Sequence, residues 1–431
     1  RREIGIFPAD WKVKPLLELC WFQEGPGLRQ WQFTTSGMKV INVTNLENNV
    51  LNLDSTERHI SLPEFNRMYQ HFSIDAGDIL MASSGNSYSK TAKVRDRDLP
   101  LMMNTSVIRF KPIGKTVCGF LWAFLNSSVF KDQIDLMITG GAQPNFGPYH
   151  LKRVLMPVPS SEEQRAIAEV LSDVDRLLGA LEALMAKRRA IKQAATQQLL
   201  TGKTRLPGFP QKDRSARPSV GTLPMDWNVA ALNDVCLKIQ DGTHFSPTPG
   251  GSDYLYVTSR NIGFGILDIS NADTISTAEH RKIYSRCDTR YGDLLLTKDG
   301  ANTGNAALNT LCEECSLLSS VAFLRFDPRL DDARFFLQYI LSGPGQRRLK
   351  EMMSGNAITR LTLDKIKRFI VPRPTPGEQE AISTILSDMD DEIAALERRR
   401  DKTRAIKQGI MQELLTGRVR LVKPEAVQAG T

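Results

Sequence analysis

The 431 residues are too many for one ordinary domain, and a hydrophobic fraction of 41% is enough for packed cores. The formal net charge of +8 favours a polyanionic partner such as nucleic acid, but charge alone does not identify one. No secretory start and no apolar run of membrane-spanning length is present, and the 6 cysteines favour reduced thiols over a disulfide framework. We therefore expect an intracellular, cytoplasmic protein.

Residues 1–156 are predicted to form a small mixed α/β domain. Short apolar or alternating runs predict strands, and they include MKVINVT, GDILMAS and SVIRF. The segment GFLWAFLNSSVFKDQIDLM predicts one or two amphipathic helices. Trp11, near the entrance of the domain, is interpreted as a core anchor rather than a ligand contact.

Residues 157–206 are predicted to form one long helix with its cap. Ser160 and Glu163 have capping-box spacing, in which the hydroxyl accepts an amide proton and the glutamate returns the bond. The helix is expected to end before Gly202, which suits the left-handed cap conformation. About forty residues at roughly 1.5 Å each give a length near 60 Å. Its apolar residues recur at the spacing of a coiled-coil seam. These residues are Ile167, Leu171, Val174, Leu178 and Leu181.

The second half of the chain repeats the first at an offset of about 215 residues. Residues 207–371 are predicted to form a second α/β domain, with strands in YLYVTS, GDLLLTK and VAFLRF and helices in ARFFLQYILSGPGQRRLKEMM. Trp227 repeats Trp11 and is interpreted in the same way. The framework repeats more closely than the loops, which is how one scaffold would carry two readers of different targets.

Residues 372–421 repeat the long helix and its cap, and residues 422–431 are predicted to be a flexible tail. Thr375 and Glu378 again have capping-box spacing, and Gly417 stands where Gly202 does. The seam of this helix is formed by Ile382, Leu386, Met389, Ile393 and Leu396.

Both long helices are acidic in their first half and basic in their second half. Antiparallel packing places acidic halves against basic halves, whereas parallel packing places like charges together. The same gradient would also complement the dipole of each helix by itself. We expect an α+β protein in which two globular α/β domains are separated by two long antiparallel helices that form a coiled coil, with an internal pseudo-twofold repeat.

The combination of features resembles the specificity subunit of type I restriction-modification systems. The resemblance rests on the two-copy layout, the PxDW entrances, the EEQ-to-LLTG helices, the GDIL and GDLL loops and DGTHFSPTP at 241–249. It implies two target-recognition domains that each read one half of a split site in double-stranded DNA. It also implies that the helices act as a spacer and as a dock for two methyltransferase subunits, and that restriction (translocase) subunits join that core.

No catalytic motif is found in the chain. The DPPY and NPPF strips of adenine methyltransferases are missing, and the GKT triplets at Gly114 and Gly202 lack the earlier glycine of a phosphate-binding loop. Cys312 and Cys315 form a single CxxC, which supplies too few ligands for structural zinc. We expect no catalytic residue, cofactor or metal in this chain, with S-adenosylmethionine bound by the methyltransferase subunit.

Candidate DNA contacts are the polar residues in the loops that differ between the two copies. Lysine and arginine neutralise phosphates, whereas Asn, Gln, Arg and Lys also reach base edges in the major groove. Turn formation and solvation are the competing interpretations for each residue. In the first domain the candidates are Ser84, Asn86, Tyr88, Lys90, Gln143 and Asn145. In the second domain they are Thr243, His244, Lys298, Asp299, Asn302, Asn305 and Arg360.

Three other functions remain open at this stage. The chain is compatible with a specificity subunit that serves a fused restriction-methylation enzyme, with an enzyme whose active site carries no familiar motif, and with a coiled-coil scaffold for protein interactions. Protection of a discrete split DNA site by the assembled complex would exclude the scaffold, because a scaffold has no sequence dependence.

Overall fold

The computed structural model describes residues 5–47, 49–85, 88–138, 144–248, 251, 253–353 and 360–423. The chain forms two compact units, each of which combines one globular domain with parts of both long helices. Unit 1 consists of Arg1–Glu182 and Arg399–Thr431, and unit 2 of Ala183–Arg398. The candidate at Asn86 and the candidate at Gln143 lie outside the described residues.

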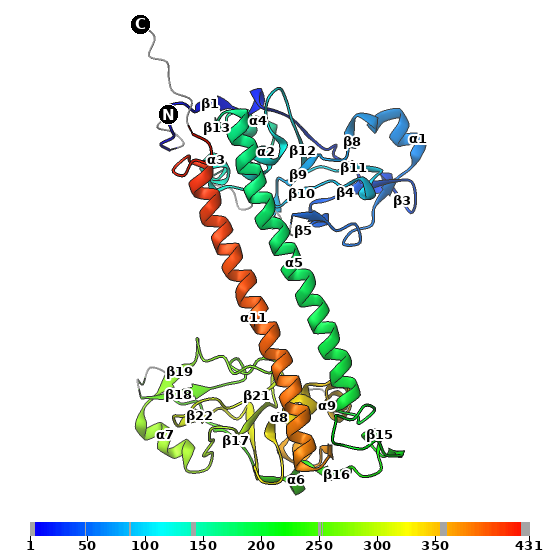
Figure 1. Ribbon diagram of the computed structural model, residues 1–431, viewed down its shortest axis with the longest axis vertical. Helices are drawn as coiled ribbons and strands as arrows, with labels where there is room; N and C mark the ends of the chain where they lie inside the picture. The colour runs from blue at the N-terminus through cyan, green and yellow to red at the C-terminus, as the bar shows by residue number, and fades with distance from the viewer. Residues whose placement is uncertain are drawn as a thin grey trace. The chain divides into compact units, whose positions relative to one another are not determined.

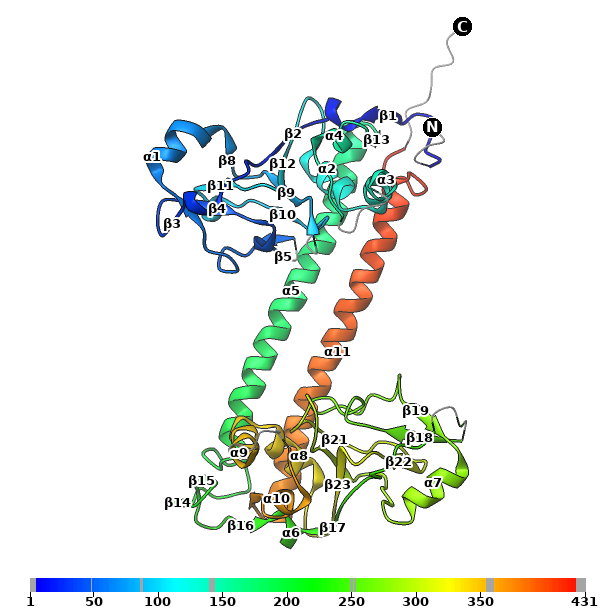
Figure 2. The same ribbon diagram turned by 180° about the vertical axis from the view of Figure 1, so that it is seen from behind.

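Unit 1 contains two sheets that share the hydrophobic core of the domain. An antiparallel sheet has the order β10-β9-β12-β2, and a mixed sheet has the order β3-β7-β4-β11-β8, in which β4 and β11 run parallel. The four-stranded sheet lies on the side of α5, as Figures 1 and 2 show. The strands of the first sheet are β2 (Cys20–Glu24), β9 (Ile79–Ala82), β10 (Thr91–Lys93) and β12 (Val107–Pro112). Those of the second are β3 (Phe33–Thr34), β4 (Met38–Ile41), β7 (His59–Ile60), β8 (Ser73–Ile74) and β11 (Leu101–Met103).

In the described part of the chain, two short strand pairs and four short α-helices complete the domain of unit 1, beside short 3₁₀ and π-helical segments. The strands β1 and β13 join the beginning of the domain to its end, directly before the long helix. The pairs are β1 (Lys12–Pro15) with β13 (Leu155–Val158) and β5 (Leu46–Glu47) with β6 (Val50–Leu51). The helices are α1 (Leu62–Glu64), α2 (Cys118–Leu125), α3 (Ser128–Met137) and α4 (Pro148–Leu151).

Unit 2 repeats the four-stranded sheet with the same connectivity. Its order is β17-β23-β20-β21, so that β17, β20, β21 and β23 correspond to β2, β9, β10 and β12. The second sheet is smaller than in unit 1 and has the order β19-β18-β22, with β18 and β22 parallel. The first sheet consists of β17 (Cys236–Asp241), β20 (Leu294–Thr297), β21 (Ala306–Leu308) and β23 (Val321–Phe326). The second consists of β18 (Tyr254–Val257), β19 (Asp273–Ile275) and β22 (Cys315–Leu317).

The remaining elements of unit 2 follow the plan of unit 1, with one added hairpin. The entry pair is β16 (Asn228–Ala231) with β24 (Ile370–Arg373), and the hairpin is β14 (Arg214–Arg217) with β15 (Gly221–Pro224). The helices are α6 (Leu232–Val235), α7 (Thr277–Tyr284), α8 (Ala333–Leu341), α9 (Gly343–Met353) and α10 (Leu363–Lys367). The sequence therefore predicted the strands correctly, and each segment expected to hold one or two helices holds two.

The long helices α5 (Ser161–Leu199) and α11 (Pro376–Leu415) run for 39 and 40 residues, as predicted. Gly202 and Gly417, shortly after their ends, have φ of 59° and 68° and thus adopt the expected left-handed conformation. Trp11 and Trp227 are each only 2% exposed, which confirms their interpretation as core anchors.

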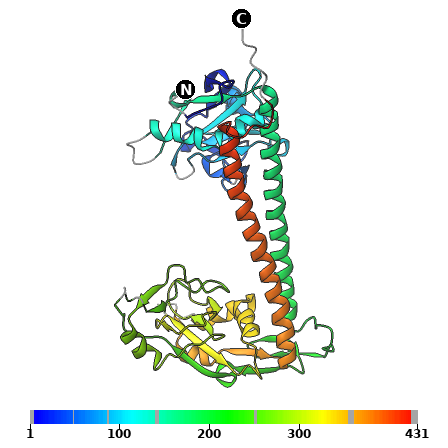
Figure 3. The same ribbon diagram turned by 60° about the vertical axis from the view of Figure 1, so that its left-hand side comes forward.

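Within each unit the two long helices run antiparallel (Figure 3). Ion pairs connect basic late residues of one helix to acidic early residues of the other. In unit 2, Lys192 pairs with Asp390. In unit 1, Lys407 lies 2.6 Å from the Asp175 carboxylate. The charge gradient therefore predicted the direction of packing correctly. Most of these pairs are half-exposed, so they set orientation more than they add stability.

The predicted seam residues divide between the helix pair and the domain cores. Ile167 and Leu171 belong to the core of the first domain together with Leu414 and Leu415 from the end of α11. Ile382 and Leu386 belong to the core of the second domain in the equivalent way. Further along, Leu181 and Ile393 are buried at 4% and 9% exposure, whereas Val174, Leu178, Met389 and Leu396 are half-buried. The first turns of each helix are therefore part of a globular core and not only of a coiled coil.

The capping-box prediction is only half correct. The Ser160 hydroxyl accepts the Glu163 N–H at 3.2 Å, as expected, but the Glu163 side chain does not return to residue 160. Its carboxylate instead accepts hydrogen bonds from Trp11 Nε1 at 3.1 Å and from Arg420 Nη2 at 2.8 Å. The side chains of Trp11 and Arg420, both distant in the chain, thus take the place of the N–H of residue 160 as donors to Glu163. The hydrogen bond from Arg420 is stronger than one from a neutral N–H, because Arg420 is charged.

Equivalent partners surround Glu378 in unit 2, and we call this arrangement the junction of each unit. The capping-box prediction is wrong here, because the Glu378 N–H bonds to the Thr375 carbonyl at 3.0 Å and not to its hydroxyl. Glu378 accepts a hydrogen bond from Trp227 Nε1 at 3.0 Å and another from Arg205 Nη2 at 2.7 Å, and Arg205 also pairs with Asp226. In unit 1 the matching residues are Trp11, Glu163, Arg420 and Asp10. Each junction ties the segment after one long helix to the start of the other helix and to the domain entrance.

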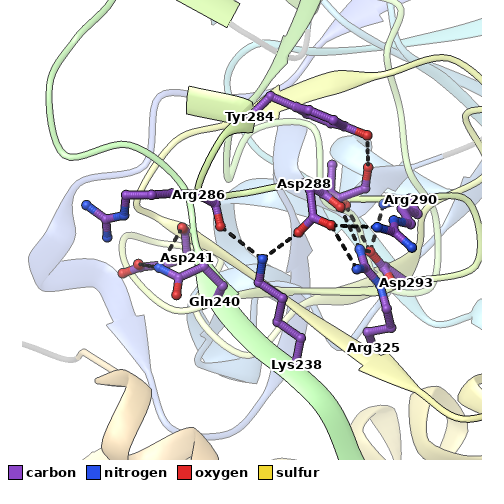
Figure 4. A network of polar contacts seen from close by, with 10 residues as sticks. Lys238, Gln240, Asp241, Tyr284, Arg286, Asp288, Arg290, Asp293 and Arg325 are labelled. Carbon is purple, nitrogen blue, oxygen red and sulfur yellow. Dashed lines mark hydrogen bonds and ion pairs between the residues drawn. The ribbon is translucent and has the colours of Figure 1, made fainter. Parts of the chain in front are cut away.

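A network of charges supports the first sheet of unit 2 (Figure 4). Arg325 on β23 bonds to Asp293 and to Asp288, and Lys238 on β17 also donates to Asp288. Burial alone would raise the pKa of Asp288, but the hydrogen bonds from Lys238 and Arg325 outweigh it and hold the pKa at about 2, below the ordinary 3.8.

We expect the Asp288→Asn variant to lose stability at neutral pH and much less in acid. Because the folded pKa lies below the unfolded one, the carboxylate stabilises the folded state above about pH 4, and this contribution is lost as the pH falls toward 2. The difference in pKa corresponds to about 2 kcal/mol. Denaturant unfolding at pH 7 and near pH 2.5 measures both values, with the exposed Asp391→Asn as the control. A loss that is equal at both pH values would contradict this account.

Candidate nucleic-acid interface

The strand registers show which residues of the two units are equivalent. In unit 1, Ile108 on β12 lies opposite Glu24 on one side and Met81 on the other. In unit 2, Ala322 on β23 lies opposite Asp241 and Leu296 in the same way. Glu24 and Asp241 therefore occupy the same position, at the end of the first strand of each four-stranded sheet.

In unit 1 this position belongs to a group of residues that we call the polar corner of unit 1: Glu24, Ser83, Ser84, Ser106 and Asn145. Backbone bonds hold the group together, since Ser83 donates to the Ser106 carbonyl at 2.9 Å and Ser84 forms a β-bridge with Asn145. The Ser106 N–H also bonds to the Glu24 carboxylate. The candidates Ser84 and Asn145, which are 61 positions apart in the chain, are thus brought together.

The polar corner of unit 2 consists of Asp241, Lys298, Asp299, Ser320 and Arg360, and it has the same backbone frame. Lys298 donates to the Ser320 carbonyl at 2.8 Å, and Asp299 forms a β-bridge with Arg360. The candidates Asp299 and Arg360 are therefore the structural counterparts of Ser84 and Asn145. The frame is shared, but the side chains that it presents differ in charge.

Lys298 is buried at 2% exposure and is not a surface contact. Its Nζ lies 3.1 Å from Asp241 Oδ2, and the side chain of Asp241 is also nearly inaccessible at 5%. A buried charge of this kind persists only when it is paired. Lys298 therefore neutralises Asp241, while the exposed His244, with Nε2 3.4 Å from the same carboxylate, faces solvent.

The other candidates range from buried to exposed. Thr243 is 8% exposed, and its backbone bonds to Leu317 and Ser319. Asn302 and Asn305 each donate from the side-chain amide to a backbone carbonyl, so turn formation accounts for part of their chemistry. Lys90 is exposed.

Tyr88 is half-buried in unit 1 and is held by a partner. Its hydroxyl donates to Asp135 Oδ1 at 2.6 Å. Burial and the neighbouring carboxylate both raise the pKa of the Tyr88 hydroxyl, which keeps it protonated. The side chain is thus fixed in place beside Phe146, whose ring it meets edge-on.

The sequence did not single out Glu24, Ser83, Arg205 or Arg420. Arg205 and Arg420 precede the repeated leucines Leu206 and Leu421, so the repeat itself contained that signal. The repeat gave no such signal for Glu24. A bulge in β17 between Cys236 and Lys238 shifts the alignment of the two copies by one residue, so Glu24 and Asp241 do not align in the sequence.

Among the residues that the structure describes, no three His, Cys, Asp or Glu side chains are placed to hold a metal ion. Cys312 is exposed and Cys315 is buried. In the same part of the chain, the helices are too short or too polar to span a bilayer.

Comparison with known proteins adds one family match, two relatives and one solved structure. The model of the "Type I restriction modification DNA specificity domain" family matches residues 8–192 and 224–404. The MjaVIII specificity subunit of a type I restriction enzyme from Methanocaldococcus jannaschii is 22% identical over 327 residues, covering 74% of this chain and 75% of that protein. The EcoKI specificity subunit from Escherichia coli is 20% identical over 356 residues, covering 80% and 74%. The crystal structure of a type I restriction-modification S subunit from M. genitalium has the same fold, with a TM-score of 0.57 over 96% of this chain and 97% of that one at 14% identity.

Proposed function

The chain belongs to the type I restriction-modification DNA specificity family, of which it carries two domain copies, and we propose that each copy reads one half of a bipartite DNA site. The observation that carries this proposal is the pair of polar corners. One backbone frame, repeated in both units, presents Ser84 with Asn145 in one case and Asp299 with Arg360 in the other. Two sites with one geometry and different side chains suit the recognition of two different sequences.

We further propose that the chain itself performs no chemistry and that its partners supply it. Two methyltransferase subunits would bind S-adenosylmethionine and modify the DNA, and restriction subunits would join the assembly. Apolar side chains exposed on the long helices support docking there. On α5, Leu184 and Ile191 lie seven residues apart and therefore on one face, at 39% and 40% exposure. Ile406, the repeat counterpart of Ile191 on α11, is 49% exposed.

The test of this function is a map of methylated bases in a host that expresses the complete system. We expect one split motif, with a modified adenine in each half, that disappears when this chain is deleted. A map without a split motif would contradict the proposal. The purified chain alone, measured by calorimetry, should bind no S-adenosylmethionine, because that site is assigned to the methyltransferase.

We expect Arg360→Ala to relax recognition at one base pair of a single half-site. Its side chain is 45% exposed, and its position is set by the bridge to Asp299, whose carboxylate is 3.6 Å from Nε. An arginine that bonds to guanine contributes about 1–3 kcal/mol of discrimination, whereas the loss of a phosphate contact weakens binding to all sequences equally and lowers its salt dependence. Binding of the assembled complex to single-base variants of the site separates the two cases. Arg329→Ala, which removes another exposed arginine of unit 2, is the control. A uniform loss across all sequences would assign Arg360 to phosphate.

A further inference from the structure

The two polar corners differ most in whether their carboxylate, that of Glu24 in unit 1 or of Asp241 in unit 2, has a cationic partner. In unit 2, the carboxylate of Asp241 meets the ammonium group of Lys298 at 3.1 Å. The position equivalent to Lys298 in unit 1 is Ser83, because both residues follow the second strand of the sheet and donate to the equivalent serine carbonyl. Ser83 is fully buried and carries no charge.

Glu24 consequently has no cationic partner among the residues that the structure describes. Its carboxylate bonds to the Ser106 N–H, and burial raises the pKa of the Glu24 carboxyl. One oxygen also lies close to the backbone of Gly147, 3.4 Å from the place where a Cβ would stand. The hydroxyl of Ser83 has no hydrogen-bond partner in the described part of the chain. The polar corner of unit 1 thus retains an acceptor that its own side chains do not satisfy.

Glu24 lies beside residues that are candidates for contact with DNA. It lies in the same corner as Ser84 and the exposed Asn145, which are held by the β-bridge and by the bond from Phe146 N to the Ser83 carbonyl at 3.0 Å. Glu24 is itself half-buried and not enclosed. In the major groove, the hydrogen-bond donors that a carboxylate can accept are the amino groups of cytosine and adenine, whereas guanine and thymine present acceptors there.

We propose that Glu24 is a specificity-determining residue of the first domain and accepts a hydrogen bond from the exocyclic amino group of a cytosine or adenine in the major groove. The inference rests on the proposed function and makes it more specific. Asp241, already neutralised by Lys298, does not play this part in unit 2, where Arg360 and His244 present donors instead. The two polar corners therefore present different groups to DNA: an unneutralised carboxylate in unit 1, and a neutralised carboxylate beside the donors of Arg360 and His244 in unit 2.

The test uses the complete complex and its mapped DNA motif. Glu24→Met keeps the length of the side chain but removes both acceptor oxygens, and we expect discrimination at one base pair of the first half-site to fall by about tenfold or more. The second half-site should stay unchanged. Glu18→Met, which makes the same change at an exposed glutamate of the same domain, is the matched control and should keep the whole motif. Unchanged discrimination at every base pair in Glu24→Met would overturn the inference.

A second measurement does not depend on whether the variant folds. Wild-type complex is bound to DNA in which single bases of the first half-site lack the amino group, with 2-pyrimidinone for cytosine or purine for adenine. We expect one such replacement to weaken binding by about tenfold or more, and the position to identify the base. Glu24→Met should show little additional loss on that DNA. If no amino group matters in the first half-site, the inference is wrong although the split motif stands; if wild type yields no split motif, the proposed function itself fails.

Discussion

Glu378→Ala is expected to destabilise unit 2 by about 2–3 kcal/mol, because it removes the buried carboxylate that accepts two hydrogen bonds from Arg205 and leaves that guanidinium with Asp226 as its remaining partner. The side chains of Glu378 and Arg205 are only 1% and 4% exposed. The same substitution removes the acceptor of the Trp227 indole N–H. Chemical denaturation of the full chain, followed by tryptophan fluorescence, measures the free energy of unfolding.

The repeat supplies a graded comparison for this variant. Glu163→Ala makes the same change in unit 1, but Arg420 is 20% exposed and therefore keeps part of its hydration. Its cost should be smaller than that of Glu378→Ala. Glu397→Ala, which removes an exposed partner of Arg189, should cost less than about 1 kcal/mol. If Glu378→Ala costs no more than Glu397→Ala, the junction does not stabilise the unit in the way described.

The helices were the most predictable part of the fold, because their signals are local. Periodicity and the glycines Gly202 and Gly417 defined their extent, and the charge gradient gave their antiparallel direction. The partners of Glu163 and Glu378 were not predictable. A capping box is a local pattern, whereas the donors that displaced it come from Trp11 and Arg420, or from Trp227 and Arg205.

The sequence predicted which loops form the candidate site, but not what each residue does there. The divergence between the copies correctly drew attention to Ser84, Asn145, Asp299 and Arg360, which the fold brings together in pairs. It gave no sign that Lys298 is buried, because its partner Asp241 is distant in sequence. The equivalence of Glu24 and Asp241 required the strand register, since a bulge beside the exposed Leu237 adds one residue to β17.

Exchange of the second domain is expected to change one half of the recognised site completely and leave the other half intact. The physical reason is that each unit has its own core and its own polar corner, built from its own sheet. Residues 207–371 would be replaced by the equivalent segment of a relative that retains the aspartate and tryptophan of the junction at positions 226 and 227. Arg205 and Glu378 lie outside the exchanged segment, so their contacts to the new domain are preserved.

The readout of the exchange is the methylation motif of the complete system, compared with that of the parent and of the relative. The hybrid should combine the first half-site of this chain with one half-site of the relative, since no side chain of the exchanged segment belongs to the polar corner of unit 1. The reciprocal exchange of residues 1–156 is the matched control and should change the other half alone. A hybrid in which both halves change would show that the two domains do not read independently, and a hybrid that keeps the parental motif would place recognition outside the exchanged domain.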